Sequence, residues 1–276
     1  MVHRYQTKDI ETPIDIAIIG GTGICDPQFL KNAVAKKIYT PFGDTSGSVL
    51  IGEFEGTRLA FLARHDTTHR LPPHLVPYQA NIWALKQLGV SRILAPCSVG
   101  SLQPHLNMGD LVIPDQFFDW TKGREYSYFN AGQVAHISMA DPLCSELRNI
   151  AIDSAQELNL AFHPKGTTVT IEGPRFSTRA ESLFFKNVVK GDIIGMTLVP
   201  ECVLARELEI CYVSLAMVTD FDAWKVDSEP VSHSNVEKIA KQNTETIKRL
   251  LKIILPKIPE KRTVCQCYDA LDHAMV

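Results

Sequence analysis

Residues 14–23 read IDIAIIGGTG, a run of mostly apolar, β-branched residues that ends on three glycines and a threonine. Such a run predicts a buried strand that passes into a tight turn. Backbone N–H groups of this turn, with no Cβ in the way, can form an anion-binding hollow, and the Thr22 hydroxyl adds a donor. The last glycine of a dinucleotide fingerprint is missing, because position 26 is Asp, and no Walker A lysine follows. A phosphate site and a plain tight turn therefore both stay open here.

Strand-like and helix-like segments alternate on either side of this stretch. We expect strands over 14–19, 49–54, 58–62, 92–96, 110–114, 167–171 and 211–219, and helices over about 77–88, 142–158 and 232–255. The alternation predicts an α/β fold with a mixed central sheet flanked by helices. No linker divides the chain, so we expect a single domain over 1–276, with its core at about 14–255 and a loosely held tail at 256–276.

Composition narrows the kinds of partner. The 276 residues are 45% hydrophobic and 21% charged, as in ordinary globular proteins. The net charge of -3 leaves no surplus of Lys and Arg to neutralise a nucleic-acid backbone, so a small molecule is the expected partner. No uncharged apolar run approaches the roughly 18 residues of a membrane helix. Residues 1–11 carry charges of both signs and lack an apolar stretch, so no secretory signal is visible and a cytoplasmic location is expected.

Metal binding finds little support in the sequence. The seven cysteines are scattered, which favours reduced and mostly buried thiols. Their only close pair, Cys265 and Cys267, is one residue short of the Cys-x-x-Cys spacing of redox and zinc sites. The trio His65, His69 and His74 spans a Leu-Pro-Pro segment that no helix can cross, so we expect no metal site.

Polar groups at two strand ends could carry chemistry. Arg64 next to His65 offers a cationic fork and a second donor for an oxyanion, although a solvated loop would have the same sequence. Asp220 and Asp222 lie two residues apart, so on an extended segment they would project to the same side. They are too close to flank a sugar as a glycosidase pair, and one acid acting on a heterocycle nitrogen fits better. Phe176, in a Gly-Pro turn, could stack on a flat ring or pack in the core.

Taken together, these motifs resemble the 5′-methylthioadenosine phosphorylase branch of the trimeric purine nucleoside phosphorylase family. The matching stretches are 18–23, 40–43, 78–86, 112–117, 170–177, 196–197 and 219–222. The resemblance, which runs from about 14 to 254, implies cleavage of the N-glycosidic bond of 5′-methylthioadenosine by inorganic phosphate as co-substrate, giving adenine and 5-methylthioribose 1-phosphate without a cofactor. Such a reaction passes through an oxocarbenium-like sugar, so it needs a dianion near C1′ and a stabilised leaving purine.

The resemblance also assigns roles by matching position. For phosphate it implies hydrogen-bonding groups at Thr22, Arg64, His65, Cys97, Ser98 and Thr197. For the nucleoside it implies Phe176, Ser177, Met196, Asp220, Asp222 and His233, with His136 from a neighbouring subunit of a homotrimer or of a hexamer made of two trimers. Asp220 is the expected catalytic acid, supported by Asp222. Ser177 and Asp220 replace the Glu and Asn of the guanine and hypoxanthine branch, which implies a preference for 6-aminopurines.

Several positions depart from the family pattern. Asp66 replaces a glycine and could repel phosphate or pair with Arg70. Cys97-Ser98 replaces a Thr-Ala pair, which affects the expected phosphate contacts. His233 stands where this branch has an apolar residue facing the thiomethyl group. An imidazole suits a 5′-hydroxyl better than a thioether. His233 therefore indicates either a broader adenosine or purine nucleoside phosphorylase or a surface histidine at a helix start.

The same motifs are compatible with two further functions. A non-catalytic purine-nucleoside binder could share the fold, and a nucleosidase would use water in place of phosphate.

The cysteines match a feature of archaeal relatives, which carry disulfides and a Cys-x-Cys tail. By matching position the resemblance implies a bridge between Cys144 and Cys211, and it identifies Cys265 and Cys267 with the tail motif.

Overall fold

The computed structural model describes residues 13–21, 29–130, 132–226, 231–262 and 264–276. Thr22 and the rest of the glycine turn beyond Gly21 thus lie outside the described residues. No helix in the described ranges is both long enough and apolar enough to cross a membrane.

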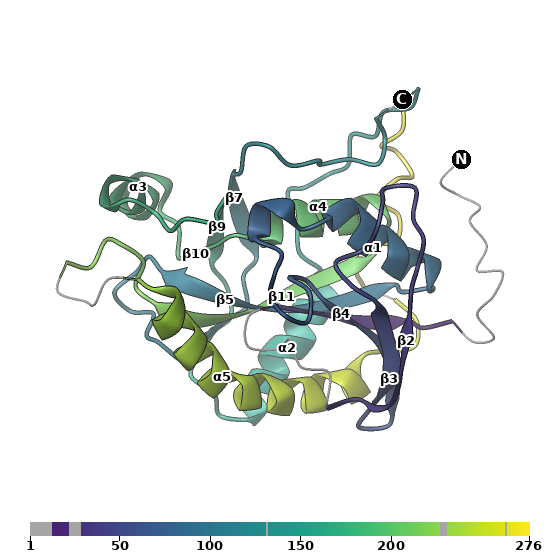
Figure 1. Ribbon diagram of the computed structural model, residues 1–276, viewed down its shortest axis with the longest axis horizontal. Coiled ribbons are helices and arrows are strands. Elements are labelled where there is room, and N and C mark those ends of the chain that lie inside the picture. The colour runs from purple at the N-terminus through teal and green to yellow at the C-terminus, as the bar shows by residue number, and fades with distance from the viewer. Residues whose placement is uncertain (1–12, 22–28, 131, 227–230, 263) are drawn as a thin grey trace.

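A mixed sheet forms the middle layer of the fold (Figure 1). Within the described residues its strand order is β2-β3-β4-β1-β5-β10-β9-β7, and β5 also pairs with β11, which continues to β6 and β8. The strands are β1 Ile16–Gly20, β2 Lys31–Lys36, β3 Val49–Phe54, β4 Thr57–Ala63, β5 Arg92–Ser101, β6 Leu111–Val112, β7 Gln116–Trp120, β8 Phe162–His163, β9 Thr167–Ile171, β10 Ile193–Gly195 and β11 Cys211–Asp220. This arrangement, with helices on both faces, confirms the expected fold class.

Helices cover both faces of the sheet because its central strands are apolar on both sides. In β1, Ala17 and Ile19 pack into the core with α1 and α4, whereas Ile16 and Ile18 pack into the core with α2 and α5. The helices are α1 Tyr78–Gln87, α2 Ser145–Glu157, α3 Arg179–Phe184, α4 Leu198–Glu207 and α5 His233–Ile254. Figure 1 shows α1 and α4 above the sheet and α2 and α5 below it.

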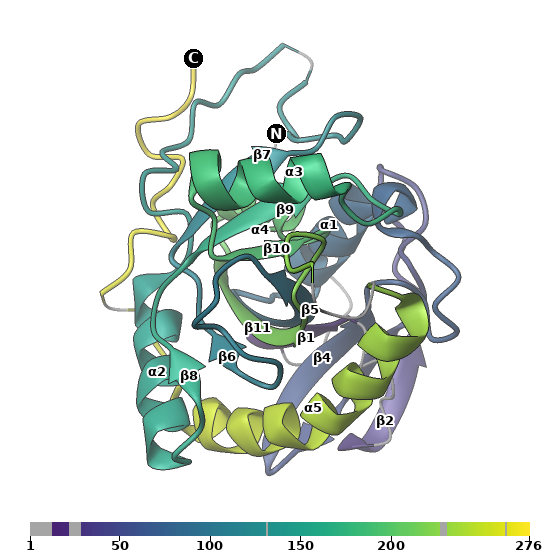
Figure 2. The ribbon, with the colours of Figure 1, turned by 90° about the vertical axis from the view of Figure 1, so that its left-hand side faces the viewer.

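Parallel pairing gathers several strand ends at one edge of the sheet. β1 is parallel to both β4 and β5, and β5 is parallel to β11 over nearly its whole length. The carboxyl ends of these strands therefore meet, and ligands in open α/β sheets bind at such edges. Figure 2 looks toward this edge, which α3 and α5 frame.

The long periodic elements were predictable, and the short ones were not. The strands expected at 49–54 and 58–62 form an antiparallel hairpin, and the three expected helices correspond to α1, α2 and α5. The expectation of a loosely held tail is wrong. Cys265 and Cys267 join the core on the α2 side, and Leu271 and Ala274 pack against Phe129.

Candidate active site

A cavity of about 470 Å³ opens at the gathered strand ends. Much of the cavity lining consists of residues that were predicted from the sequence to belong to the site: Arg64, His65, Cys97, Ser98, Phe176, Met196, Thr197, Asp220, Asp222 and His233. They come from the ends of β4, β5 and β11, from the segments after β9 and β10, and from the first residue of α5. The fold thus brings these side chains together in one cavity, although Arg64 and His233 are 169 positions apart in the sequence.

Arg64 is buried and held by a carboxylate. Its Nε and Nη2 atoms each donate to Glu201, over 2.7 Å, and Glu201 also accepts from the Tyr212 hydroxyl. Burial opposes the charge of Arg64, but the Glu201 carboxylate raises its pKa beyond the ordinary value. Nη1 has no hydrogen-bond partner within the part of the chain that the structure describes. A Cβ on Gly21 would lie 2.6 Å from Nη1, so this donor faces Gly21.

His65 is neutral at physiological pH. Burial, with the charge of Arg64 in addition, lowers its pKa to about 3. Its Nδ1 lies 2.8 Å from the Leu71 carbonyl oxygen, which can only accept, so Nδ1 carries the proton. The Nε2 atom of the neutral ring is then an acceptor, suited to a protonated oxygen of an anion. Both Arg64 and His65 are buried, so the solvated-loop interpretation of this motif is wrong.

The loop after His65 resolves the question raised by Asp66. Its carboxylate accepts from Arg70 Nε over 2.8 Å, and this pairing is the main cause of its lowered pKa. Asp66 is absent from the cavity lining, whereas Arg70 belongs to it. The structure therefore confirms the pairing with Arg70 and not a carboxylate that faces the anion.

Three smaller side chains complete this end of the cavity. Cys97 keeps its proton, because burial raises the pKa of the thiol, and its Sγ lies 3.4 Å from the Ser214 hydroxyl. Ser98 follows it on β5 and lines the cavity. Thr197 precedes α4, and its side chain makes no capping hydrogen bond with that helix. A hydroxyl that does not cap its helix can instead serve an anion in the cavity.

The same cavity is lined by a pair of acids, Asp220 and Asp222, which lie beside Gly100 on β5, three residues beyond Cys97. Burial raises the pKa of Asp220 and of Asp222, and the neighbouring charge of Asp222 adds to the effect on Asp220. The Asp222 backbone N–H donates to Asp220 Oδ1 over 2.8 Å. The geometry expected from the sequence is wrong, because β11 ends at Asp220 and Asp222 has a φ of +46°, outside any extended conformation. The acids meet through this turn.

The remaining nominated residues divide into two groups. Phe176, with 36% of its surface exposed, lines the cavity and does not pack in the core. Met196 also lines it. Ser177 does not line it, and its buried hydroxyl has no hydrogen-bond partner among the described residues. His136 lies outside the lining too, where its N–H donates to the Ala274 carbonyl of the tail.

Sequence reasoning missed two buried residues that shape the site. Glu201 positions Arg64, as described above. Arg124 donates to the carbonyl oxygens of Glu172, Met196 and Val199 over 2.6–2.7 Å, and so ties together the segments after β9 and β10. Neither residue belongs to a recognisable sequence motif. Their partners lie far away in the sequence, so the neighbouring residues do not indicate that Glu201 or Arg124 has a role.

A row of imidazoles lines one side of the cavity. The ring centroids of His65 and His69 are 4.6 Å apart, and those of His69 and His233 are 6.0 Å apart. Burial, and then the charge of His233, lowers the pKa of His69. His233 is thus both the first residue of α5 and a cavity residue.

Comparison with known proteins places this site in a family. The pattern of the phosphorylase superfamily matches residues 15–256. The S-methyl-5'-thioadenosine phosphorylase of Pyrococcus furiosus is 54% identical over 261 residues, which cover 95% of this chain and 99% of that protein. A methylthioadenosine phosphorylase from an antarctic soil metagenomic library superimposes with a TM-score of 0.89 at 45% identity, covering 96% of this chain and 93% of the other.

A third relative comes from Schistosoma mansoni. Its methylthioadenosine phosphorylase, solved in complex with adenine, gives a TM-score of 0.88 at 36% identity and covers 94% of this chain and 96% of its own. A mutant of it, described as an adenosine/methylthioadenosine phosphorylase, was solved with methylthioadenosine. The chain belongs to the phosphorylase superfamily. Within that superfamily it is a member of the methylthioadenosine phosphorylase family.

The buried pair of Arg64 and Glu201 yields a test of stability. We expect Glu201→Gln to lower the free energy of unfolding by about 3–5 kcal/mol, because it leaves a buried guanidinium without its counter-charge. Denaturant unfolding measures this. The control is Glu245→Gln, which removes the exposed partner of Lys248 and should cost less than about 1 kcal/mol. Equal losses for the two variants would contradict the assignment.

Proposed function

We propose that this enzyme cleaves 5′-methylthioadenosine with inorganic phosphate, releasing adenine and 5-methylthioribose 1-phosphate. The observation that carries the proposal is the division of one cavity into two ends. One end has the Nη1 donor of Arg64 facing Gly21, and the other has the acids Asp220 and Asp222 beside Gly100. A reaction that needs an anion on one side of a sugar and a proton donor beyond it fits this division.

At the phosphate end the chain supplies charge and directed hydrogen bonds. Arg64 is held rigidly by Glu201, so its remaining edge is preorganised for an oxyanion and needs little reorganisation. Ser98 and Thr197 would add hydroxyl donors, and the family resemblance implies a further hydroxyl at Thr22. His65, with its proton on Nδ1, would accept a hydrogen bond from the hydroxyl group of hydrogen phosphate through Nε2.

At the end of the cavity that would hold the base, Asp220 would act as the general acid. Its raised pKa keeps the carboxyl protonated to higher pH than an exposed aspartic acid. The protonated group can donate to N7 of the leaving purine, and the ionised group can accept from the 6-amino group. General acid catalysis of this kind contributes about 10²–10⁴-fold. Asp222 would hold Asp220 in place through its backbone N–H.

The decisive experiment is product analysis. Methylthioadenosine, adenosine and inosine are each incubated with the enzyme, with and without orthophosphate. We expect adenine and a ribose 1-phosphate only where phosphate is present, and little cleavage of inosine. Adenine release without phosphate would identify a nucleosidase, and binding without cleavage a nucleoside binder.

The same assay tests base recognition with a variant. Asp220→Asn removes the acid and places a donor opposite the 6-position. It should lower the kcat for adenosine by about 10²-fold or more, and inosine should be affected much less. If inosine cleavage fell in the same proportion as adenosine cleavage, the role of Asp220 in choosing the base would be overturned.

A second substrate, adenosine, is favoured by the histidines near the start of α5. His69 and His233 place polar rings at this side of the cavity, beside the apolar Val236. A hydroxyl can hydrogen-bond to an imidazole, whereas a thioether is a weak acceptor. We infer that a 5′-hydroxyl is accepted alongside the thiomethyl group.

Replacing His233 separates these substrates. We expect His233→Val to lower kcat/KM for adenosine while that for methylthioadenosine is kept or raised, so that their ratio shifts about tenfold, because a hydrogen bond to the hydroxyl is lost. Steady-state kinetics with both substrates measure the ratio. His163→Val, outside the cavity, is the control. An unchanged ratio of the two kcat/KM values would show that His233 does not contribute to recognition of the 5′ substituent.

We further propose a homotrimer, or a hexamer of two trimers. His136 lies outside the cavity of its own chain, and large apolar side chains such as Trp120, Phe184 and Val188 are exposed. Light scattering after gel filtration should give three or six times the chain mass of 30.7 kDa. A monomer would contradict it. The absence of a cofactor and a cytoplasmic location stay predictions.

A further inference from the structure

The guanidinium of Arg124 contacts the main chain of two loops that form walls of the cavity. Its Nη1 atom donates to the carbonyl oxygen of Met196 over 2.7 Å and to that of Val199 over 2.6 Å. Its Nη2 atom donates to the carbonyl oxygen of Glu172 over 2.7 Å and to that of Ile171 over 3.4 Å. The Arg124 side chain is only 2% exposed and does not line the cavity. It therefore holds the walls without contacting what the cavity binds.

A third wall segment is reached through Tyr78. Nη1 of Arg124 lies 3.3 Å from the Tyr78 hydroxyl, and this hydroxyl donates to the Pro73 carbonyl oxygen over 2.9 Å. Burial raises the pKa of Tyr78, so the hydroxyl keeps the proton that it donates. The guanidinium carbon also lies 5.3 Å from the centroid of the Tyr78 ring. Because Pro73 lines the cavity, Arg124 holds segments at 73, 171–172 and 196–199, directly or through one side chain.

The same three segments touch one another at Gly173. A Cβ on this glycine would lie 2.6 Å from Sδ of Met196 and 3.4 Å from Cγ of Pro73. Van der Waals contacts of this kind have little directional preference, whereas hydrogen bonds to carbonyl oxygens do. The contacts at Gly173 bring the walls together, and the hydrogen bonds of Arg124 fix how they are oriented.

Arginine suits this position, and its own backbone is anchored. Its planar fork donates along two edges at once, which an ammonium group with one nitrogen cannot do. The segment that follows Arg124 is tied to two helices. The Gln79 side chain of α1 donates to the Ser127 carbonyl over 2.8 Å, and the Tyr128 N–H donates to Glu207 of α4 over 2.8 Å. The fork is therefore held from outside the cavity.

We propose that Arg124 is a positioning residue for the reaction in the cavity, which sets the wall that would hold the nucleoside relative to the end that would hold phosphate. This inference rests on the proposed function for the identity of the two ligands. On the nucleoside side, Arg124 fixes the loop after Glu172, which carries Phe176, and it fixes the backbone of Met196. Both of these side chains line the cavity.

On the phosphate side the same guanidinium acts along α4. Thr197 stands between the two residues whose carbonyl groups Nη1 binds, and Glu201 follows two residues after the second of them. Glu201 in turn holds Arg64. A displaced Arg124 would therefore disturb both ends of the cavity together, which a residue in contact with one ligand would not do.

Replacement of Arg124 by lysine tests the proposal. The lysine keeps the charge but cannot donate along two edges. We expect Arg124→Lys to lower kcat/KM for methylthioadenosine by about 10²-fold, because a small misplacement of binding groups has this effect. KM for orthophosphate should rise together with KM for methylthioadenosine. Steady-state kinetics, with each substrate varied in turn, measure both constants.

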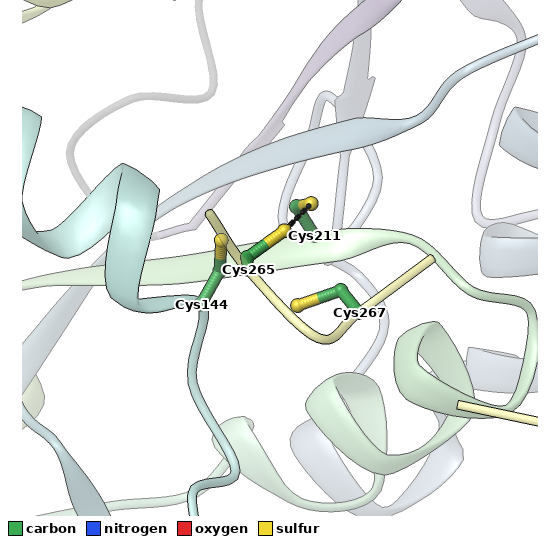
Figure 3. Close-up of side chains that lie close together, drawn as sticks. All are labelled: Cys144, Cys211, Cys265 and Cys267. Carbon is green, nitrogen blue, oxygen red and sulfur yellow. Dashed lines mark hydrogen bonds between the residues drawn. The ribbon is translucent and has the colours of Figure 1, made fainter. Parts of the chain in front are cut away.

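Arg148 provides the matched control, because it also binds carbonyl groups from two segments. It donates to the Pro114 carbonyl over 2.8 Å and to the Pro164 carbonyl over 2.6 Å, and none of the three residues lines the cavity. It lies on α2, one turn after Cys144, which Figure 3 shows beside the other three buried cysteines. The pairing of these cysteines stays a prediction. Arg148→Lys should lower Tm and leave both KM values unchanged.

Calorimetric titration with adenine separates this inference from the proposed function. If the unmodified chain binds adenine without cleaving the nucleoside, the proposed reaction fails, and the Kd for adenine decides the role of Arg124. We expect this Kd to rise about tenfold in Arg124→Lys and to stay unchanged in Arg148→Lys. Should Arg124→Lys not fold, Tyr78→Phe removes only the hydroxyl that leads to Pro73 and should raise the Kd about threefold.

Two results would overturn the proposal. One is a folded Arg124→Lys variant, or Tyr78→Phe in its place, whose Kd for adenine equals that of the unmodified chain. The other is an equal loss in Arg124→Lys and Arg148→Lys, which would show that both arginines contribute to stability alone.

Discussion

The rest of the site depends on the buried ion pair between Arg64 and Glu201. A guanidinium with 1% of its side chain exposed needs a counter-charge, and Glu201 supplies both carboxylate oxygens. This bidentate contact joins the end of β4 to α4, and Tyr212 extends it to β11. Because two of the three guanidinium nitrogens are occupied, the third is aimed in one direction. The fold thereby fixes an otherwise flexible side chain, with Nη1 directed toward Gly21.

The second constraint is the register of β5 on β11, which positions the acids. Gly100 pairs with Asp220 across a bulge that follows Val218. A Cβ on Gly100 would lie 2.7 Å from Asp220 Oδ1, so only glycine leaves room for the carboxyl at this place. Cys97 and Ser98 lie on the same strand, toward the anion end. One strand thus carries both Cys97 and Ser98 and the glycine against which Asp220 lies, and so fixes their relative positions in the cavity.

Prediction from sequence succeeded where the information was local. Arg64, His65 and Asp220 follow apolar strands, and strand ends can be located from periodicity alone. Glu201 and Arg124 were missed because their roles depend on partners far away in the sequence. The tail at 256–276 was wrongly expected to be loosely held, because its partners are also far away in the sequence. Its polar residues suggest exposure, whereas Leu271, Ala274 and the two cysteines are buried by segments that only the fold brings near.

The imidazole row links the anion end of the cavity to its 5′ end. His65 is neutral because burial and the charge of Arg64 both lower its pKa. A bound dianion would favour the protonated form of His65, and a positive charge there would disfavour protonation of His69, 4.6 Å away. His69 would then face His233 as a neutral ring, able both to donate and to accept. On the proposed function, the charge of the ring that a 5′ substituent meets would therefore depend in part on whether phosphate is already bound.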